Sequence, residues 1–291
     1  MSQYLAMSNG RQIPTVGLGT WLIDNREVGK VVRDAIDLGY RHIDTAEAYD
    51  NERGVGEGIK ESGLERENIF VTTKVKAEYK TYDLAAEAID KSLEDLQLDY
   101  VDLMLIHCPE PWDQFRGSQR FFQENQEVWR ALEDAYKAGK VKGIGVANFL
   151  QDDLDNLMAG AEIKPMVNQI LCHAGNTPLD LIDYCHDQGI VVEAYSPMGH
   201  GEVLNNDDLA AMAAKYNVST ADLCIQYDLQ LGTIALPKAR STEHLRNNLK
   251  PWKEGFVISD DDMAYLKALK LNDYGESAQW PCYKGNDSRS R

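Results

Sequence analysis

Four ionisable side chains lie at or just beyond the ends of successive apolar runs, and their types suit proton transfer. They are Asp44, Tyr49, Lys74 and His107. A tyrosine hydroxyl has an ordinary pKa of about 10, and a nearby ammonium lowers that pKa because it favours the phenolate. We therefore interpret Tyr49 as a general acid tuned by Lys74. Asp44 would keep the lysine charged and oriented, and His107 would direct an imidazole N–H toward a substrate oxygen.

Each of these residues has a structural alternative when it is taken alone. An aspartate and a lysine can form a satisfied ion pair, and a single histidine at a strand end is more often structural than catalytic. Burying a lone charge is costly unless it has partners, so charges that end apolar runs should converge. The four together favour one catalytic site over separate structural roles.

Residues at the ends of separate runs can meet only if the runs end at one place. Eight apolar runs alternate with amphipathic stretches, at 13–20, 40–46, 69–75, 101–107, 141–149, 166–171, 190–196 and 233–238. Most are rich in Val and Ile without polar alternation, which is typical of parallel strands covered on both faces. Eight strand–helix units in a chain of this length predict an α/β fold, a closed (β/α)8 TIM barrel whose chemistry lies at the C-terminal strand ends.

The stretches between the runs have helical spacing and characteristic ends. Val28, Val32 and Ile36 fall on one helical face, and Gly39 follows as a residue suited to the left-handed cap position. Glycine recurs after the later stretches, as Gly139, Gly189 and Gly232. The pattern predicts a ring of amphipathic helices around the strands.

Segments outside the eight units predict additions to the barrel. Asn9-Gly10 predicts the turn of an N-terminal β-hairpin ahead of the first barrel strand. Residues 259–270 predict an extra C-terminal helix with Ser259 as its N-cap, followed by a loop over 272–291. No linker or change of composition divides the chain, so we expect one domain over residues 1–291.

Composition and charge exclude several classes of protein. The 291 residues carry 30 basic and 47 acidic side chains, a net charge of −17 that argues against broad binding to nucleic acid or anionic membranes. The five cysteines are odd in number and form no CxxC pair, so we expect neither a disulfide framework nor a metal site. With no signal-peptide pattern and no apolar run of membrane-spanning length, we predict a cytoplasmic protein without a membrane partner.

Eight short motifs stand in order along the chain. They are GLGTW at 17–21, GYRHIDTA at 39–46 followed by Tyr49 and Asn51-Glu52, VTTK at 71–74, LIH at 105–107, GIGVANF at 143–149, NQ at 168–169, AYSP at 194–197 and LPK at 236–238. The ordered set resembles the aldo-keto reductase family, most closely its bacterial diketogluconate and aldehyde reductases, over nearly the whole chain. The resemblance implies hydride transfer from NAD(P)H to the carbonyl of a small aldehyde or ketone. It also implies a monomer, with Tyr49 as the acid.

The resemblance further implies where the cofactor and the substrate bind. Cofactor contacts would come from Thr20, Asn148, Gln169, Tyr195, Ser196, Lys238, Arg240, Ser241, His244 and Asn248. In relatives, an aromatic at the position of Tyr195 stacks on nicotinamide, and amides at the positions of Asn148 and Gln169 hold its carboxamide. The substrate pocket would be lined by Trp21, His107, Trp112 and Trp280. No GxGxxG motif follows a strand, so the Rossmann mode of dinucleotide binding is not expected.

The cationic segment 238–248 departs from the pattern of NADPH-preferring members. Ala239 replaces the usual Ser or Thr, His244 replaces a common Arg, and Asn247 replaces the usual Glu. A charge-assisted bond from an arginine is worth about 1.5–3 kcal/mol, which a neutral histidine does not supply. Lys238 and Arg240 still favour phosphate, so we predict NADPH as the cofactor, with NADH as a possible second one.

Two alternatives stay open. One is an NADPH-binding regulatory or sensor subunit on the same scaffold, and the other is a barrel with different chemistry, such as sugar phosphate isomerisation. The presence of all four catalytic residue types favours an enzyme. Substrate choice would be set by the loops 110–122, 198–206 and 272–285, whose aromatic side chains suit small aldehydes, α-keto compounds or keto sugars.

Overall fold

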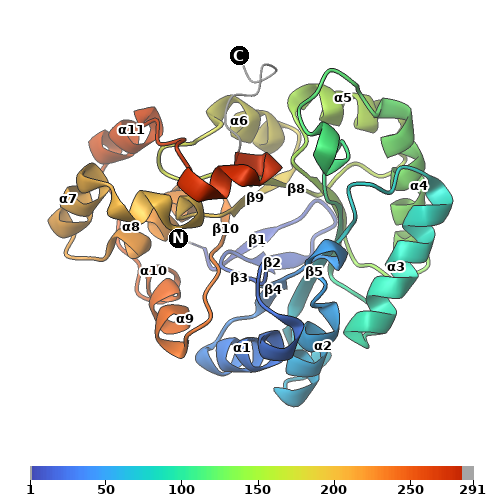
Figure 1. The fold of residues 1–291 in the computed structure, drawn as a ribbon, viewed down its shortest axis with the longest axis horizontal. Coiled ribbons are helices and arrows are strands. Elements are labelled where there is room, and N and C mark those ends of the chain that lie inside the picture. Colours follow the sequence, from blue (N-terminus) through green and yellow to red (C-terminus); the bar gives the residue numbers. More distant parts are fainter. Residues whose placement is uncertain (1, 284–291) are drawn as a thin grey trace.

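Eight parallel strands form the barrel in the computed structural model, which describes residues 2–283. They follow one another around the sheet in chain order (Figure 1). The strands are β3 (Leu18–Gly19), β4 (His42–Asp44), β5 (Phe70–Val75), β6 (Leu103–Ile106), β7 (Ile144–Ala147), β8 (Val167–Leu171), β9 (Val191–Tyr195) and β10 (Ile234–Leu236). Parallel bridges from Val16 to Ala235 and from Gly19 to Lys238 close the sheet on itself. The predicted TIM barrel is therefore confirmed.

The first predicted strand is split in two. Its beginning, β2 (Gln12–Pro14), pairs antiparallel with β1 (Tyr4–Ala6), and only β3 enters the barrel. Between them a Cβ on Gly17 would come within 2.7 Å of Leu236 and 2.8 Å of His42. A side chain at position 17 would therefore require Leu236 and the buried His42 ring to move.

Helices surround the strands as the spacing predicts (Figure 1). They are α1 (Asn25–Leu38), α2 (Glu52–Glu61), α3 (Tyr82–Leu96), α4 (Phe122–Lys137), α5 (Gln151–Gly160), α6 (Leu179–Asp187), α7 (Asp207–Lys215), α8 (Thr220–Gln230), α9 (Thr242–Asn248), α10 (Lys250–Lys253) and α11 (Asp260–Ala268). The predicted face of α1 is buried, and Gly39 caps it in the left-handed region with φ 110°. No helix among the described residues is long and apolar enough to cross a membrane.

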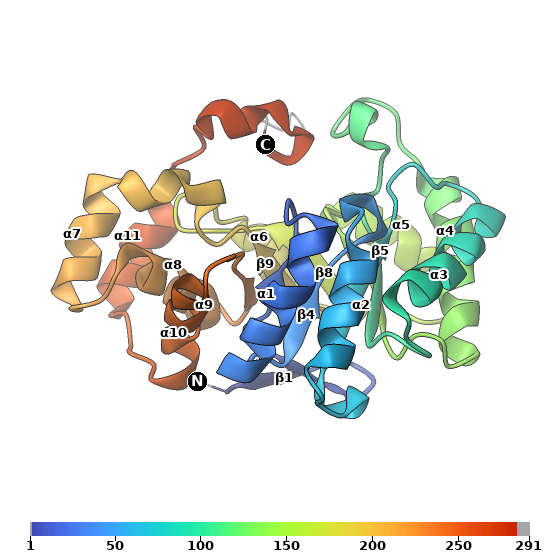
Figure 2. The same ribbon diagram turned by 60° about the horizontal axis from the view of Figure 1, so that its bottom comes forward.

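The two ends of the barrel are covered by different segments (Figure 2). The hairpin β1–β2 lies across one end, and the C-terminal segment after α11 lies over the other, where the cavity described below opens. Ser259 caps α11 by accepting a hydrogen bond from the Asp262 N–H, as predicted. The loop expected after it contains two short 3₁₀ helices, η5 (Gly275–Gln279) and η6 (Pro281–Tyr283). Tyr274 and Tyr283 of this segment are buried against the barrel mouth, a packing that no repeating pattern predicts.

Candidate active site

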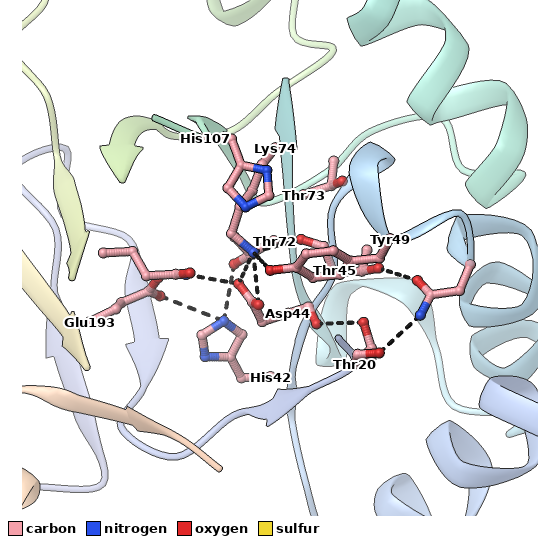
Figure 3. Close-up of polar contacts among 12 residues, drawn as sticks. Thr20, His42, Asp44, Thr45, Tyr49, Thr72, Thr73, Lys74, His107 and Glu193 are labelled. Atoms are coloured by element: carbon pink, nitrogen blue, oxygen red, sulfur yellow. Dashed lines mark hydrogen bonds and ion pairs between the residues drawn. The ribbon is translucent and has the colours of Figure 1, made fainter. Parts of the chain in front are cut away.

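A buried ion pair stands at the ends of β4 and β5. The Lys74 ammonium lies 2.8 and 2.9 Å from the two carboxylate oxygens of Asp44 and donates to the carbonyl of Thr45 at 2.8 Å (Figure 3). Burial by itself would lower the pKa of Lys74, but the charge and hydrogen bond of Asp44, together with Tyr49 and Glu193, raise it above its ordinary value. The lysine thus remains a cation in a place where a lone charge would be costly.

The Tyr49 hydroxyl lies beside this ammonium. Its oxygen is 3.4 Å from the Lys74 Nζ, and its ring lies edge-to-face with the His107 ring, with centroids 5.6 Å apart (Figure 3). The expectation that Lys74 brings the Tyr49 pKa below its ordinary value is wrong. Burial raises the pKa of Tyr49 to about 12, and the opposing effect of Lys74 is smaller. The phenol therefore keeps its proton throughout the neutral range and is available as a donor.

Tyr49 is held in place by the turn that carries it. It ends the 3₁₀ helix η1 (Glu47–Tyr49), between β4 and α2. The Asn51 amide fixes this turn, because its oxygen accepts from the Thr45 hydroxyl at 2.8 Å and its nitrogen donates to the carbonyl of Thr20 at 2.9 Å. Since Asn51 is 1% exposed, these bonds are not exchanged with water.

His107 reaches the same point from the end of β6. Burial, followed by the charge of Lys74, holds its pKa well below the ordinary value, so the imidazole is neutral. Its ring is wedged edge-to-face between Tyr49 and Trp112, whose centroid is 5.3 Å away. The Nδ1 atom has no partner among the described residues. Because Nδ1 is buried, a hydrogen bond from His107 to a substrate oxygen in the cavity would come from Nε2, which can carry the N–H of the neutral ring.

All four residue types meet at a cavity of about 540 Å³ that opens at the barrel mouth. Asp44, Tyr49 and His107 line it directly, and Lys74 stands behind them. The aromatic wall consists of Trp21, Trp112, Tyr195, Trp280 and Tyr283. All three tryptophans predicted for the substrate pocket are therefore brought to the cavity. No cluster of three or more His, Cys, Asp or Glu side chains in residues 2–283 is arranged to hold a metal ion.

Comparisons with known proteins identify the family of this chain. The model of the Aldo/keto reductase family matches residues 15–271. The chain belongs to this family. It is 43% identical to glyoxal reductase of Bacillus subtilis, over 92% of each chain, and 37% identical to a glycerol 2-dehydrogenase (NADP(+)) of Saccharomyces cerevisiae, over 92% of this chain and 91% of that one. The crystal structure of an aldo/keto reductase from Brucella melitensis superposes with a TM-score of 0.84 at 34% identity, covering 92% of this chain and 99% of that one.

Three of the predicted cofactor residues of this aldo-keto reductase meet on one side of the cavity. Asn148 adopts a left-handed conformation with φ 63° and donates to the His107 carbonyl at 3.0 Å. Its side-chain oxygen accepts from the Tyr195 hydroxyl at 2.8 Å, which fixes the tyrosine ring. Gln169 lines the cavity beside them.

The remaining predicted cofactor residues are less close together. Ser196 and Lys238 line the cavity, and the Ser196 hydroxyl is hydrogen-bonded to Tyr283. Three others, Arg240, Ser241 and His244, are exposed beyond its edge, and Asn248 is buried in α9. Thr20 does not line the cavity, because its hydroxyl donates to the Asp44 carbonyl inside the fold.

Sequence reasoning missed one buried acid beneath the site. Glu193 lies in the middle of β9 and is fully buried. Burial, followed by the charge of Asp44, raises the pKa of Glu193 to about 8. The signal was present in the sequence, since Glu193 is the only charged residue in the run 190–196.

Proposed function

We propose that this aldo-keto reductase reduces small aldehydes and ketones with NADPH, and that Tyr49 donates the proton. The observation that carries this proposal is the meeting of the protonated Tyr49 phenol and the neutral His107 imidazole at one cavity, with the Lys74–Asp44 pair directly behind them. Neither group needs to change its protonation state before it meets a carbonyl oxygen.

The residues around the cavity fit a dinucleotide phosphate. Lys238 is a half-buried cation on the cavity wall and forms no ion pair within the described chain, so an anion would give it the partner that buried charges require. Arg240, Ser241 and His244 follow it at the exposed edge, where they can reach the rest of a phosphate group. Asn148, Gln169 and Tyr195 offer two amides and an aromatic face to a nicotinamide, and Ser196 lines the cavity next to Tyr195. Of the other expected cofactor residues, Thr20 lies behind the cavity wall and Asn248 is buried in α9.

Side chains of this protein supply the proton that the carbonyl oxygen takes up and stabilise the negative charge that this transfer leaves on Tyr49. A bound reduced nicotinamide supplies the hydride that the carbonyl carbon accepts. The carbonyl oxygen receives hydrogen bonds from the Tyr49 hydroxyl and from the His107 imidazole, and it then takes the Tyr49 proton as negative charge develops on it. The Lys74 ammonium stabilises the phenolate left on Tyr49, and Asp44 keeps that ammonium in place.

We infer a short carbonyl compound as substrate, with α-dicarbonyls first. The cavity combines three tryptophans with few polar groups, so it favours compact molecules whose polar end reaches Tyr49 and His107. The similarity to a glyoxal reductase supports the same class of substrate. A regulatory NADPH-binding role has less support, because such a role does not require Tyr49, Lys74 and His107 together.

The test is the oxidation of NADPH and of NADH with a panel of glyoxal, methylglyoxal, simple aldehydes and keto sugars. We expect turnover with dicarbonyls and aldehydes, faster with NADPH than with NADH. Tight NADPH binding without turnover across the panel would favour the regulatory role instead. A larger kcat/KM with NADH than with NADPH would show that NADH is the preferred cofactor.

A further inference from the structure

The amide of Gln169 is held between the acidic side chains of Asp44 and Glu193 at the bottom of the cavity. Its Nε2 donates to Asp44 Oδ2 at 2.8 Å and to Glu193 Oε2 at 2.7 Å. Gln169 is 2% exposed, Asp44 is 4% exposed and Glu193 is fully buried. An amide nitrogen has two hydrogens, so both are used here.

This double contact fixes which way the amide points. If the amide turned over, its oxygen would face the two acids, and the amide hydrogens would lose both acceptors. Each lost buried bond costs about 1 kcal/mol or more. The Gln169 carbonyl oxygen is consequently the polar atom left for the cavity that this residue lines.

On its other side, Glu193 faces a buried histidine but forms no hydrogen bond with it. Its second oxygen lies 3.7 Å from His42 Nε2, which also contacts the Thr72 hydroxyl at 3.0 Å. Burial lowers the pKa of His42 to about 4, so this ring is neutral and adds no cation to the layer. The position of Glu193 is set by its hydrogen bond from Gln169 and by its burial in β9, where Val192 and Ala194 precede and follow it.

We propose that Glu193 is a positioning residue, which orients the Gln169 amide so that its carbonyl oxygen accepts an N–H from a primary carboxamide in the cavity. In the function proposed above, on which this inference rests, that carboxamide belongs to the nicotinamide. Glu193 itself touches neither cofactor nor substrate. Asp44 alone would satisfy one amide hydrogen and leave the orientation of Gln169 weakly determined.

The acceptor role does not require a charge on Glu193. A protonated carboxyl group and a glutamine amide both keep an oxygen that can accept from Gln169, whereas an aliphatic side chain does not. Glu193→Gln should therefore preserve the arrangement and Glu193→Leu should abolish it. Comparing these two variants separates the effect of the hydrogen bond from the effect of a charge at position 193.

The experiment measures dissociation constants by quenching of tryptophan fluorescence, because Trp21 and Trp280 line the cavity. Two ligands are compared, NADPH and 2′-phospho-ADP-ribose, which keeps the phosphates but lacks the nicotinamide. For Glu193→Leu we expect NADPH binding to weaken about tenfold, the loss of one hydrogen bond, with the fragment unchanged. Glu193→Gln should bind both ligands within about threefold of the wild type. In Glu193→Leu, kcat at saturating NADPH should change far less than KM for NADPH.

Asp228→Asn is the matched control for Glu193→Gln, since Asp228 is a fully buried acid of α8 that does not line the cavity. Equal weakening of both ligands by Glu193→Leu, or no weakening of either, would overturn the positioning role. If Glu193→Leu does not fold, Glu193→Val is measured against the same two outcomes.

The same measurements separate this inference from the proposed function. Carbonyl reduction with unchanged NADPH affinity in Glu193→Leu would reject the role of Glu193 and keep the function. Loss of NADPH affinity in Glu193→Leu, in a protein that reduces no carbonyl compound, would keep the role and reject the reaction. A wild-type protein that binds the fragment as tightly as NADPH would reject the carboxamide contact itself.

Discussion

The floor of the cavity and its rim are built from different kinds of contact. On the floor, Asp44, Lys74, Gln169 and Glu193 stand on strands and are joined by hydrogen bonds of 2.7–2.9 Å. On the rim, Trp21 and Trp280 come from loops and meet through ring edges, with centroids 5.3 Å apart. Directional hydrogen bonds between buried polar groups leave little freedom, whereas ring contacts allow small displacements. The floor is therefore suited to fixed chemistry and the rim to the choice of substrate.

The largest effect should follow from removal of the Tyr49 hydroxyl, which stands beside the Lys74 ammonium of the floor. Tyr49→Phe keeps the ring that packs on His107 and removes only the hydroxyl. We expect kcat to fall about 10³-fold, within the usual range for general acid catalysis, with NADPH affinity unchanged. Steady-state kinetics and fluorescence titration check the two halves separately. Retained turnover would place the acid elsewhere.

The next test concerns the buried ion pair. Lys74→Met leaves the Asp44 carboxylate buried without its cation, and breaking such a pair costs about 3–5 kcal/mol of unfolding free energy. In the double variant Asp44→Leu with Lys74→Met no unpaired charge remains, so we expect most of the stability to return while activity stays lost. Urea denaturation measures the stability of both variants, and steady-state turnover measures their activity. A double variant no more stable than Lys74→Met would show that the pair is not the main source of the loss.

The floor could be predicted from sequence where a polar residue ends an apolar run. Asp44, Lys74 and His107 end apolar runs, and because parallel strands end at one mouth, their meeting could be predicted. The direction in which the pKa of Tyr49 shifts could not be predicted. It depends on how deeply the phenol is buried in the folded protein, and burial outweighs the neighbouring ammonium. Glu193 was overlooked within a run that otherwise predicts a strand.

The rim was less predictable for a different reason. Its tryptophans were identified as pocket residues, but the segment that carries Trp280 was expected to be a loop, since 3₁₀ turns of three to five residues leave no period in the sequence. The burial of Tyr283 beside Ser196 depends on parts of the chain far apart in sequence. Contacts of that kind become visible only once the barrel is closed.

The stability of the folded protein should depend on pH through Glu193, the buried acid of the floor. The pKa of Glu193 is raised in the folded protein to about 8, above its value in the unfolded chain of about 4.3, so the folded state binds the extra proton between these values. Its stabilising contribution is complete below about pH 4.3 and is lost as the pH rises through about 8. Relative to Glu193→Gln, the wild type should therefore lose melting temperature between pH 5 and pH 8. A constant difference would mean that Glu193 does not titrate in this range.

At the exposed edge, a single substitution should strengthen cofactor selection. His244→Arg places a permanent cation where the sequence departs from NADPH-preferring relatives. We expect KM for NADPH to fall about tenfold and KM for NADH to stay the same, because only NADPH carries the additional phosphate. Equal changes for both cofactors would indicate a general charge effect.

The smallest effect should come from the rim itself. Trp280→Ala removes the ring that meets Trp21 but touches none of the hydrogen bonds of the floor. We expect KM for aromatic aldehydes to rise several-fold, KM for glyoxal to change by less than a factor of two, and kcat to be retained for both. Kinetics with a series of aldehydes of increasing size measure this. A fall in kcat comparable to that of Tyr49→Phe would contradict the separation, because it would mean that the rim holds the acid in place and that the floor is not rigid on its own.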